Sequence, residues 1–272
     1  MITANGKKII KRFYSGDEGR IASSLSVGAG SQPETINDSR MQYEVERINI
    51  TSVGVEPDND RIVFRAVLPP AGIKTIYEVG LWAYPVGQIS GKTLGLLGTT
   101  SVWTNATISN ANGRANQNTM QISYSANGTT NAEVVGVNEN LSMYTGSDSI
   151  VIGYHVTVNI SSVRVRIGLD TSNYYEFVLP ASTANSYNVA RLSLSSGTMV
   201  GSPRWDEIRY VAVRPSATAA GGGNLFFDGI RVEQNSINEG NILVARSVLA
   251  IPYLVNQTID NDIEYALAVN IS

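Results

Sequence analysis

The chain of 272 residues contains no cysteine and a single histidine, His155. It can therefore form no disulfide and no thiolate metal site, and one histidine alone makes neither a metal site nor a catalytic triad. Because His155 alternates with apolar neighbours in the run IVIGYHVTV, the pattern indicates an ordinary histidine in a strand.

Basic residues are not in excess, and long apolar runs are missing. Lysine and arginine number 20 against 23 aspartates and glutamates. This balance argues against the clustered basic surface of a nucleic-acid-binding protein. No run reaches the ~18 apolar residues of a transmembrane helix, so we expect no membrane insertion. The N-terminus has neither the apolar region nor the cleavage site of a secretory signal, so we expect synthesis in the cytoplasm.

The residues that are present favour β-structure. Hydrophobic residues make up 43% of the chain and charged residues only 16%, enough apolar material for buried cores in one large or two modest domains. Asparagine, serine, threonine and glycine are frequent, which favours strands and turns over helices. We therefore predict a mostly β protein.

The clearest pattern is a hairpin over residues 163–179. The run VRVRIGL alternates apolar residues with Arg164 and Arg166, as expected of a strand with one buried and one wet face. The following DTSN supplies short polar side chains that favour a turn. In the returning run YYEFVL, the period of two places Tyr174 and Glu176 together on one face of the strand.

A short helix is predicted over residues 3–14. Thr3 can cap its N-terminus, apolar residues fall at helical spacing between basic ones, and Gly16 would end it. A membrane-surface helix is the alternative, but a helix this short is better explained by packing on a sheet. Further strands are predicted from runs of β-branched and aromatic residues bounded by turns. They cover residues 21–27, 43–53, 61–68, 77–83, 120–125, 149–159, 187–193, 208–214 and 263–271.

Several short motifs occur in order at the two ends of the chain. SVGAGSQPETIND is followed by a Glu-x-x-Arg strand, Glu44 to Arg47, and then by EVGL; near the C-terminus ARSV precedes a proline and the alternating run IEYALAVNI. These motifs resemble a family of bacteriophage virion proteins of the tail-fibre, collar or head-decoration type. The resemblance covers residues 1–90 and 240–272, and implies a β-rich module with a short N-terminal helix.

The resemblance implies a split domain. Residues 1–95 and 238–272 would form a virion-docking β domain, and residues 100–235 would be an insertion between them. Glycine-, serine- and asparagine-rich segments at 87–101 and 234–241 fit linkers on either side.

The inserted block has regularly spaced short strands, which predicts a β-sandwich. Its last run, FFDGIRVE, and the run WDEIRYV that starts at Trp205 resemble the jelly-roll fold of carbohydrate-binding modules. We therefore expect a split β domain with a short helix plus an inserted jelly-roll.

Sugar binding uses aromatic rings that stack on pyranose faces, with amides, carboxylates and guanidinium groups beside them for the hydroxyls. The candidate residues combine these types, with Tyr174 the best surface candidate: Tyr174, Glu176, Asn173, Arg166, Tyr154, Tyr210 and Trp205. The alternative is that tyrosine and tryptophan pack between sheets, and Trp205 in particular is better explained as a plug of the core.

One aspartate and several carboxylate pairs suggest further chemistry. Asp228 could ligate a structural calcium, yet one carboxylate supplies few of the oxygens that calcium needs, so a hydrogen bond to a loop backbone is the better explanation. No other cofactor is expected. Pairs for glycoside hydrolysis could be drawn from Asp170, Glu176, Asp206 and Glu207, but any β-sandwich offers such pairs, and we expect no enzyme.

The two resemblances together imply a phage virion structural protein. The favoured role is a tail or head fibre or adhesin subunit that presents the jelly-roll to host surface polysaccharide. The alternative is a capsid decoration or cement protein that stabilises the particle without binding glycans. A depolymerase ranks third. We expect other virion proteins as partners and a homo-oligomer, a trimer, because edge strands need partners or protection.

Overall fold

The computed structural model describes residues 1–70, 73–84, 91–94, 103–125, 130–158, 160–216, 222–235 and 242–268. The chain divides into two compact units, of which unit 1 comprises Met1–Ser90 and Ile237–Ser272 and unit 2 comprises Gly91–Ser236. The boundaries expected from the sequence were 95 and 238 for the split domain and 100 and 235 for the insertion. Most of the two expected linkers, 87–101 and 234–241, lies outside the described residues. In the described part of the chain no helix is long and apolar enough to cross a membrane.

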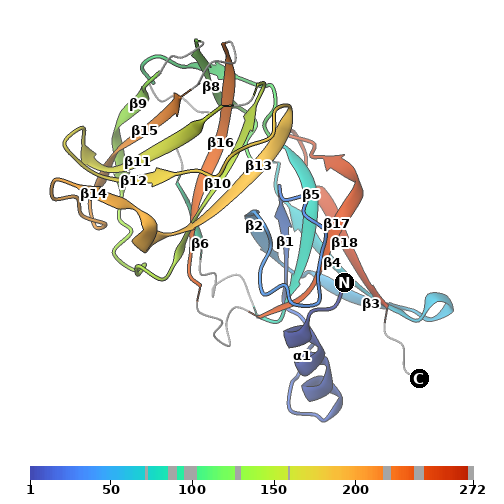
Figure 1. Ribbon diagram of the computed structural model, residues 1–272. Helices are drawn as coiled ribbons and strands as arrows, with labels where there is room; N and C mark the ends of the chain where they lie inside the picture. The colour runs from blue at the N-terminus through green and yellow to red at the C-terminus, as the bar shows by residue number, and fades with distance from the viewer. Residues whose placement is uncertain are drawn as a thin grey trace. The chain divides into compact units, whose positions relative to one another are not determined.

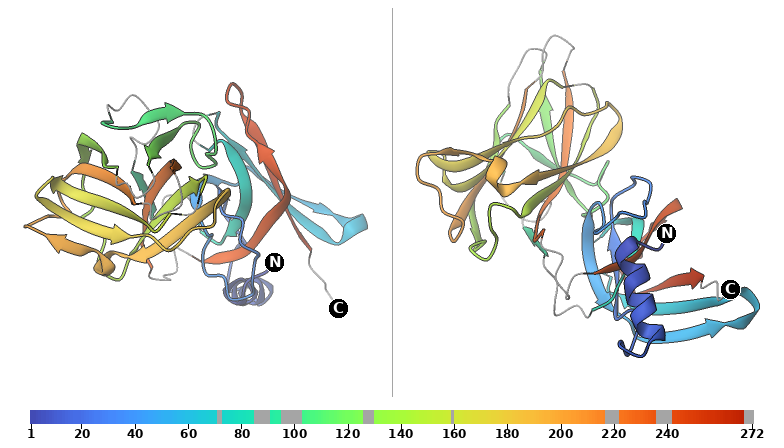
Figure 2. Two further views of the ribbon diagram at one scale, coloured as in Figure 1. Left: turned by 45° about the horizontal axis from the view of Figure 1, so that its top comes forward. Right: turned by 60° about the horizontal axis from the view of Figure 1, so that its bottom comes forward.

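Unit 1 contains a four-stranded sheet of order β17-β5-β1-β2 and a three-stranded sheet of order β18-β4-β3. The strands of the first sheet are β1 (Ser24–Gly28), β2 (Glu44–Asn49), β5 (Thr75–Trp82) and β17 (Leu243–Leu254). Those of the second are β3 (Ser52–Glu56), β4 (Arg61–Leu68) and β18 (Asn261–Ala268). The hairpin of β3 and β4 extends beyond the rest of unit 1 (Figures 1 and 2).

The predicted helix is confirmed as α1 (Ala4–Tyr14). The Thr3 side chain accepts a hydrogen bond from the Gly6 backbone N–H at 2.9 Å and donates to a carbonyl of β17, which fixes the helix start against the sheet. Gly16 follows the helix with φ +84°, a conformation that glycine adopts without strain. The buried residues Gly6 and Ile9 anchor the first half of α1, while residues 11–17 are exposed.

One predicted strand of unit 1 is wrong in its extent. The run 43–53 forms two strands, β2 in the larger sheet and β3 in the smaller, which meet at residues 50 and 51. Both parts alternate apolar and polar residues, so the sequence pattern does not show where the chain passes from one sheet to the other. Strand 61–68 is confirmed as β4. The end of the predicted strand 263–271 lies outside the described residues, which end at 268.

Unit 2 is a sandwich of two sheets, with strand orders β13-β10-β16-β8-β7 and β14-β12-β11-β15-β9, and β6 pairs with β16. The first sheet consists of β6 (Gly91–Leu94), β7 (Thr107–Ser109), β8 (Thr119–Tyr124), β10 (Ser149–Val156), β13 (Ser186–Ser193) and β16 (Gly223–Glu233). The second consists of β9 (Ala132–Glu139), β11 (Ser162–Asp170), β12 (Asn173–Val178), β14 (Thr198–Val200) and β15 (Ile208–Ser216). The expectation of a mostly β fold with a β-sandwich is confirmed.

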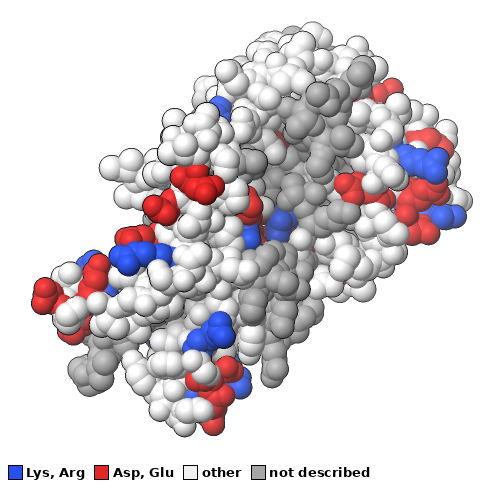
Figure 3. Space-filling view, turned by 180° about the vertical axis from the view of Figure 1, so that it is seen from behind, with Lys and Arg blue, Asp and Glu red and all other residues white. Residues whose placement is uncertain are grey.

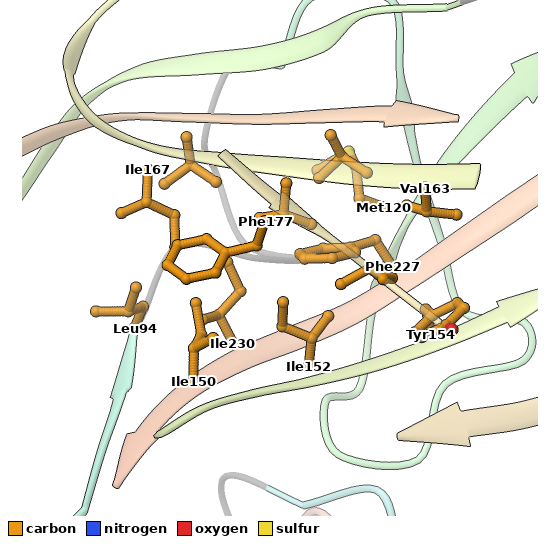
Figure 4. Close-up of a cluster of buried hydrophobic side chains, with 14 of the residues drawn as sticks. Leu94, Met120, Ile150, Ile152, Tyr154, Val163, Ile167, Phe177, Phe227 and Ile230 are labelled. Carbon is orange, nitrogen blue, oxygen red and sulfur yellow. The ribbon is translucent and has the colours of Figure 1, made fainter. Parts of the chain in front are cut away.

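Apolar side chains of both sheets meet between them and form the core of unit 2. Val163, Ile167 and Phe177 from the second sheet point toward Ile152 and Phe227 of the first (Figure 4). All are nearly inaccessible to solvent, so each contributes ~1.5–3 kcal/mol through burial of its side chain. This core fixes which side of each strand faces outward.

The predicted hairpin is confirmed by the antiparallel pairing of β11 with β12. Arg166 lies opposite Glu176 and Gly168 opposite Tyr174, so the period of two placed these side chains correctly. Strand β9 was not predicted from the sequence. Gly136 has φ +81° within it, and the register with β15 shifts between Ile208 and Tyr210, so an irregular stretch interrupts its alternation.

Candidate functional site

The outer face of the five-stranded sheet of unit 2 carries four of the seven predicted sugar-binding residues. Cross-strand pairing arranges its side chains in three rows. The first row is Val200, Tyr174, Gly168, Tyr210 and Val135; the second is Thr198, Glu176, Arg166, Ala212 and Glu133; the third is Val178, Arg164 and Arg214. We call this surface the tyrosine–arginine face.

Two tyrosines approach each other across Gly168, which has no side chain to separate them. The ring centroids of Tyr174 and Tyr210 are 6.4 Å apart with planes tilted by 49°. A Cβ at position 168 would lie 2.3 Å from the carbonyl oxygen of Asn173, so the strands can approach this closely only at glycine. The two rings with Ala212 form a small apolar cluster of their own on the outside of the sheet.

An ion-pair network crosses the second and third rows. Arg164 donates from Nη1 to Glu176 Oε1, and Arg166 donates from Nε to Glu176 Oε2, both at 2.8 Å. The guanidinium carbon of Arg166 lies 4.5 Å from the centre of the Tyr174 ring. Arg166 therefore bridges the carboxylate and the aromatic ring, and both partners hold it in one orientation.

The network keeps Glu176 ionised. Burial raises the pKa of this carboxyl group, but hydrogen bonds from Arg166 and Arg164 outweigh burial, and the pKa lies below its usual value. On the neighbouring strand, Tyr210 donates to Glu133 Oε2 at 3.0 Å. Burial and the nearby Glu133 raise the pKa of Tyr210 to about 12, so its hydroxyl stays protonated and acts as a donor.

The exposure of the tyrosines differs from the sequence-based prediction. Tyr174 is only 8% exposed, because Arg166 covers its face, and Tyr210 is 1% exposed. Neither offers a free ring surface. The exposed groups of this face include the Arg164 side chain, 45% exposed, Val135, 72% exposed, and Thr198.

Three of the predicted residues, Tyr154, Asn173 and Trp205, lie outside this face. Tyr154 belongs to β10 of the other sheet, points into the core and donates to the carbonyl of Pro180, so its expected role at the surface is wrong. Burial raises the pKa of Tyr154 to about 12. The amide of Asn173 is occupied on both sides, because Nδ2 donates to Asp170 and Oδ1 accepts from the Ser202 backbone N–H.

Trp205 packs against the core of unit 2, in line with the alternative interpretation of its sequence position. Its ring stacks on Tyr175, with centroids 4.2 Å apart and planes inclined by 5°. Both rings are half-buried and pack against the core of unit 2. The Tyr175 hydroxyl also donates to the carbonyl of Pro203, which fixes the loop that carries Trp205.

Asp228 holds a loop rather than presenting oxygens to a cation. Its Oδ2 accepts hydrogen bonds from the backbone N–H groups of Arg114 and Ala115 and from the Tyr187 hydroxyl, and its Oδ1 accepts from Asn116 N. Hydrogen-bond donors therefore occupy both carboxylate oxygens, and this arrangement does not fit a calcium ligand, whose oxygens must face the cation. Among the described residues no group of three or more histidine, cysteine, aspartate or glutamate side chains could hold a metal ion.

The single histidine lies on β10, as expected of a strand residue. The His155 ring meets the edge of Phe226, with centroids 5.9 Å apart. Burial and the charge of Arg114 lower its pKa, which favours the neutral imidazole.

Two of the candidate catalytic carboxyl groups, Asp170 and Asp206, have lowered pKa values. Hydrogen bonds from Ser172 and Asn173 lower the pKa of Asp170, and Arg204 lowers the pKa of Asp206. A glycosidase needs one carboxylic acid with a raised pKa.

Charged side chains of both signs lie together in small groups on the described part of the surface seen in Figure 3.

Sequence reasoning missed a buried network in unit 1 that joins the short motifs singled out near the two ends of the chain. Glu78 on β5 accepts from the backbone N–H groups of Gly30 (3.1 Å), Gln42 (3.0 Å) and Tyr43 (2.7 Å) and from Arg246 Nε at 2.7 Å. The same guanidinium group then extends the network by donating to Asp38 Oδ2 at 2.8 Å.

The glycines of the first motif make this approach possible. A Cβ on Gly30 would lie 2.4 Å from Glu78 Oε1, and one on Gly28 would lie 2.4 Å from the carbonyl oxygen of Tyr43. The charges of two motifs are complementary, because EVGL supplies one acid and ARSV one base. Glu78 and Arg246 are 168 residues apart in the sequence, however, so no local pattern indicated their contact.

No protein-family model and no curated protein sequence matches the chain. Similar solved structures include an agarase, AgWH50C, with a TM-score of 0.39 and 8% identity over 54% of this chain and 25% of the agarase. Others are the family 11 carbohydrate-binding module of a cellulosomal cellulase of Clostridium thermocellum (TM-score 0.36, 12% identity, 60% of this chain and 95% of the module) and a β-sandwich carbohydrate-binding module described as promiscuous (TM-score 0.38, 10% identity, 78% and 85%).

The chain thus spans only a quarter of the agarase but most of each binding module. What unit 2 binds depends on its own residues.

Proposed function

We propose that unit 2 binds a polysaccharide on the tyrosine–arginine face and that unit 1 anchors it in a bacteriophage particle as a fibre or adhesin subunit. The observation that carries the binding role is the Arg164–Glu176–Arg166 network. In it, two guanidinium groups share one carboxylate, and one of them lies over the Tyr174 ring. Planar groups held in fixed positions recognise hydroxyl groups with little loss of side-chain entropy.

The role is binding and not catalysis. Glu176, the carboxylate at the centre of the face, has a lowered pKa and is engaged by two arginines, so it is poorly suited to protonate a leaving group. Binding without catalysis requires only that the guanidinium and carboxylate groups keep their geometry.

The virion role rests on the motifs of unit 1. The three motifs meet in one buried network, which explains why such a module would contain them together. The first motif supplies Gly30 and Asp38, EVGL supplies Glu78 and ARSV supplies Arg246. In this proposal the subunit is made in the host cytoplasm, assembles as a trimer with other virion proteins and presents unit 2 to host surface polysaccharide.

A second candidate is a decoration protein whose unit 2 contacts protein and not glycan. Exposed aliphatic side chains on or beside the tyrosine–arginine face favour it, because such groups are typical of protein contacts. They are Val135 (72% exposed), Met199 (62%), Val178 (54%) and Val200 (37%).

The test is binding of the labelled full-length chain to intact bacteria of a range of envelope types. The proposal predicts saturable binding that the extracted surface polysaccharide abolishes and that Arg166→Gln weakens by about tenfold or more. The exposed Arg65→Gln in unit 1 is the matched control and should bind like the parent. Absence of binding of the folded chain to all of these bacteria would instead favour the decoration role.

A further inference from the structure

Two arginines face each other on the tyrosine–arginine face. Arg164 of β11 lies directly opposite Arg214 of β15 in the antiparallel register. Side chains in such a pair project to the same face with Cβ atoms ~5 Å apart, and like charges in this position repel. The alternation with the core residues Val163 and Val213 shows that both arginines point outward.

The carboxylates of this face do not balance the pair. Arg164 shares Glu176 with Arg166, and Glu133 is engaged by the Tyr210 hydroxyl and the Asn131 amide. Within the described part of the chain, the Arg214 side chain makes no ion pair and no hydrogen bond. Positive charge is therefore left uncompensated at the Arg164 and Arg214 end of the face, although the chain as a whole carries a net charge of −3.

The accessible groups also favour a charged ligand over a neutral one. Arg166 covers the ring of Tyr174, so a pyranose cannot stack on it while the network is intact. The exposed polar group at this end is instead the Arg164 guanidinium, with a side chain 45% exposed. Guanidinium groups have several N–H donors in a planar fork, which matches the two oxygens of a carboxylate.

We propose that the polysaccharide is acidic, and that a carboxylate of one of its uronic acid residues lies between Arg164 and Arg214. The inference rests on the proposed function of the same face. A bound carboxylate removes the repulsion between the two guanidinium groups and leaves Glu176 in place between Arg164 and Arg166. The adjacent network then contacts hydroxyl groups of the neighbouring sugar.

The test compares one polymer in two charge states. The full-length chain is titrated with a soluble polyuronate and with the same polymer after reduction of its carboxyl groups, at low and at physiological salt. Arg214→Gln is the test variant, and Arg204→Gln, an exposed arginine of unit 2 outside the face, is the matched control. Inorganic sulfate is added as a competitor in a separate arm.

The proposal predicts that the polyuronate binds at least about tenfold more tightly than its reduced form, that Arg214→Gln abolishes this difference, and that added salt weakens binding. Equal binding of both polymers, unchanged in Arg214→Gln, would overturn the acidic ligand and leave polysaccharide binding intact. Binding of neither polymer, with no neutral bacterial polysaccharide bound in the same assay, would overturn both. Competition by sulfate at equal charge concentration would indicate a site for simple anions and would also overturn the proposal.

Discussion

Arg166 covers the ring of Tyr174, with its guanidinium carbon 4.5 Å from the ring centre, while its Nε donates to Glu176. One side chain thus sets both the exposure of the tyrosine and the position of the carboxylate. It also explains why a tyrosine on the outer face of a sheet is only 8% exposed.

The contact between these two side chains should be measurable as a coupling energy. In a double-mutant cycle of Arg166→Met and Tyr174→Leu, the free energies of unfolding should be non-additive by about 0.5–1 kcal/mol, the range of a partly exposed cation–π pair. Urea unfolding of the four proteins gives the value. Strict additivity would show that the guanidinium and the ring do not interact.

Glu176 should contribute to stability in a defined pH range. Its folded-state pKa lies below the usual 4.5, so its contribution is fully present above that value and is lost as pH falls through the folded pKa. Glu176→Gln should therefore lower the free energy of unfolding at neutral pH and approach the parent as the pH falls through the folded-state pKa. A stability difference that grows as the pH falls would contradict the ion-pair network.

Asp228 should stabilise unit 2 without a metal ion. Asp228→Asn replaces one acceptor oxygen by a donor that faces backbone N–H groups, and should lower the free energy of unfolding by about 1–3 kcal/mol. A chelator should leave the melting temperature of the parent unchanged. The exposed Asp58→Asn of unit 1 is the control. A fall in melting temperature with chelator, reversed by calcium, would restore the calcium site to consideration.

The glycine motif of unit 1 should tolerate no side chain. Gly30→Ala places a Cβ 2.4 Å from Glu78 Oε1, so it should displace the loop and lower stability, whereas Gly54→Ala, with nothing within 4 Å, should be nearly neutral. Glu78→Gln should cost about 1.5–3 kcal/mol, because the buried Arg246 guanidinium loses one of its two carboxylate partners and keeps Asp38. Thermal unfolding of these variants tests the network, and equal effects of the two alanines would contradict it.

The faces of individual strands could be predicted from the sequence, since alternation in 163–179 is enough to place Arg166 and Glu176 together. Exposure could not be predicted, because it depends on which rotamer Arg166 adopts over Tyr174. The backbone partners of Asp228 lie 112 to 114 residues before it in the chain and Tyr187 lies 41 before it, and no local pattern connects them. Likewise, the irregular register of β9 with β15 removes the alternation that reveals a strand.

The position of the binding face is best tested by amide hydrogen exchange of the full-length chain with and without saturating polysaccharide. The account predicts slower exchange in β11, β12 and β15, the strands that carry Arg164, Glu176 and Arg214, with little change in β13 on the opposite sheet. Protection confined to the loop around Trp205 or to β13, with none on β11 and β12, would contradict a polysaccharide site on the tyrosine–arginine face.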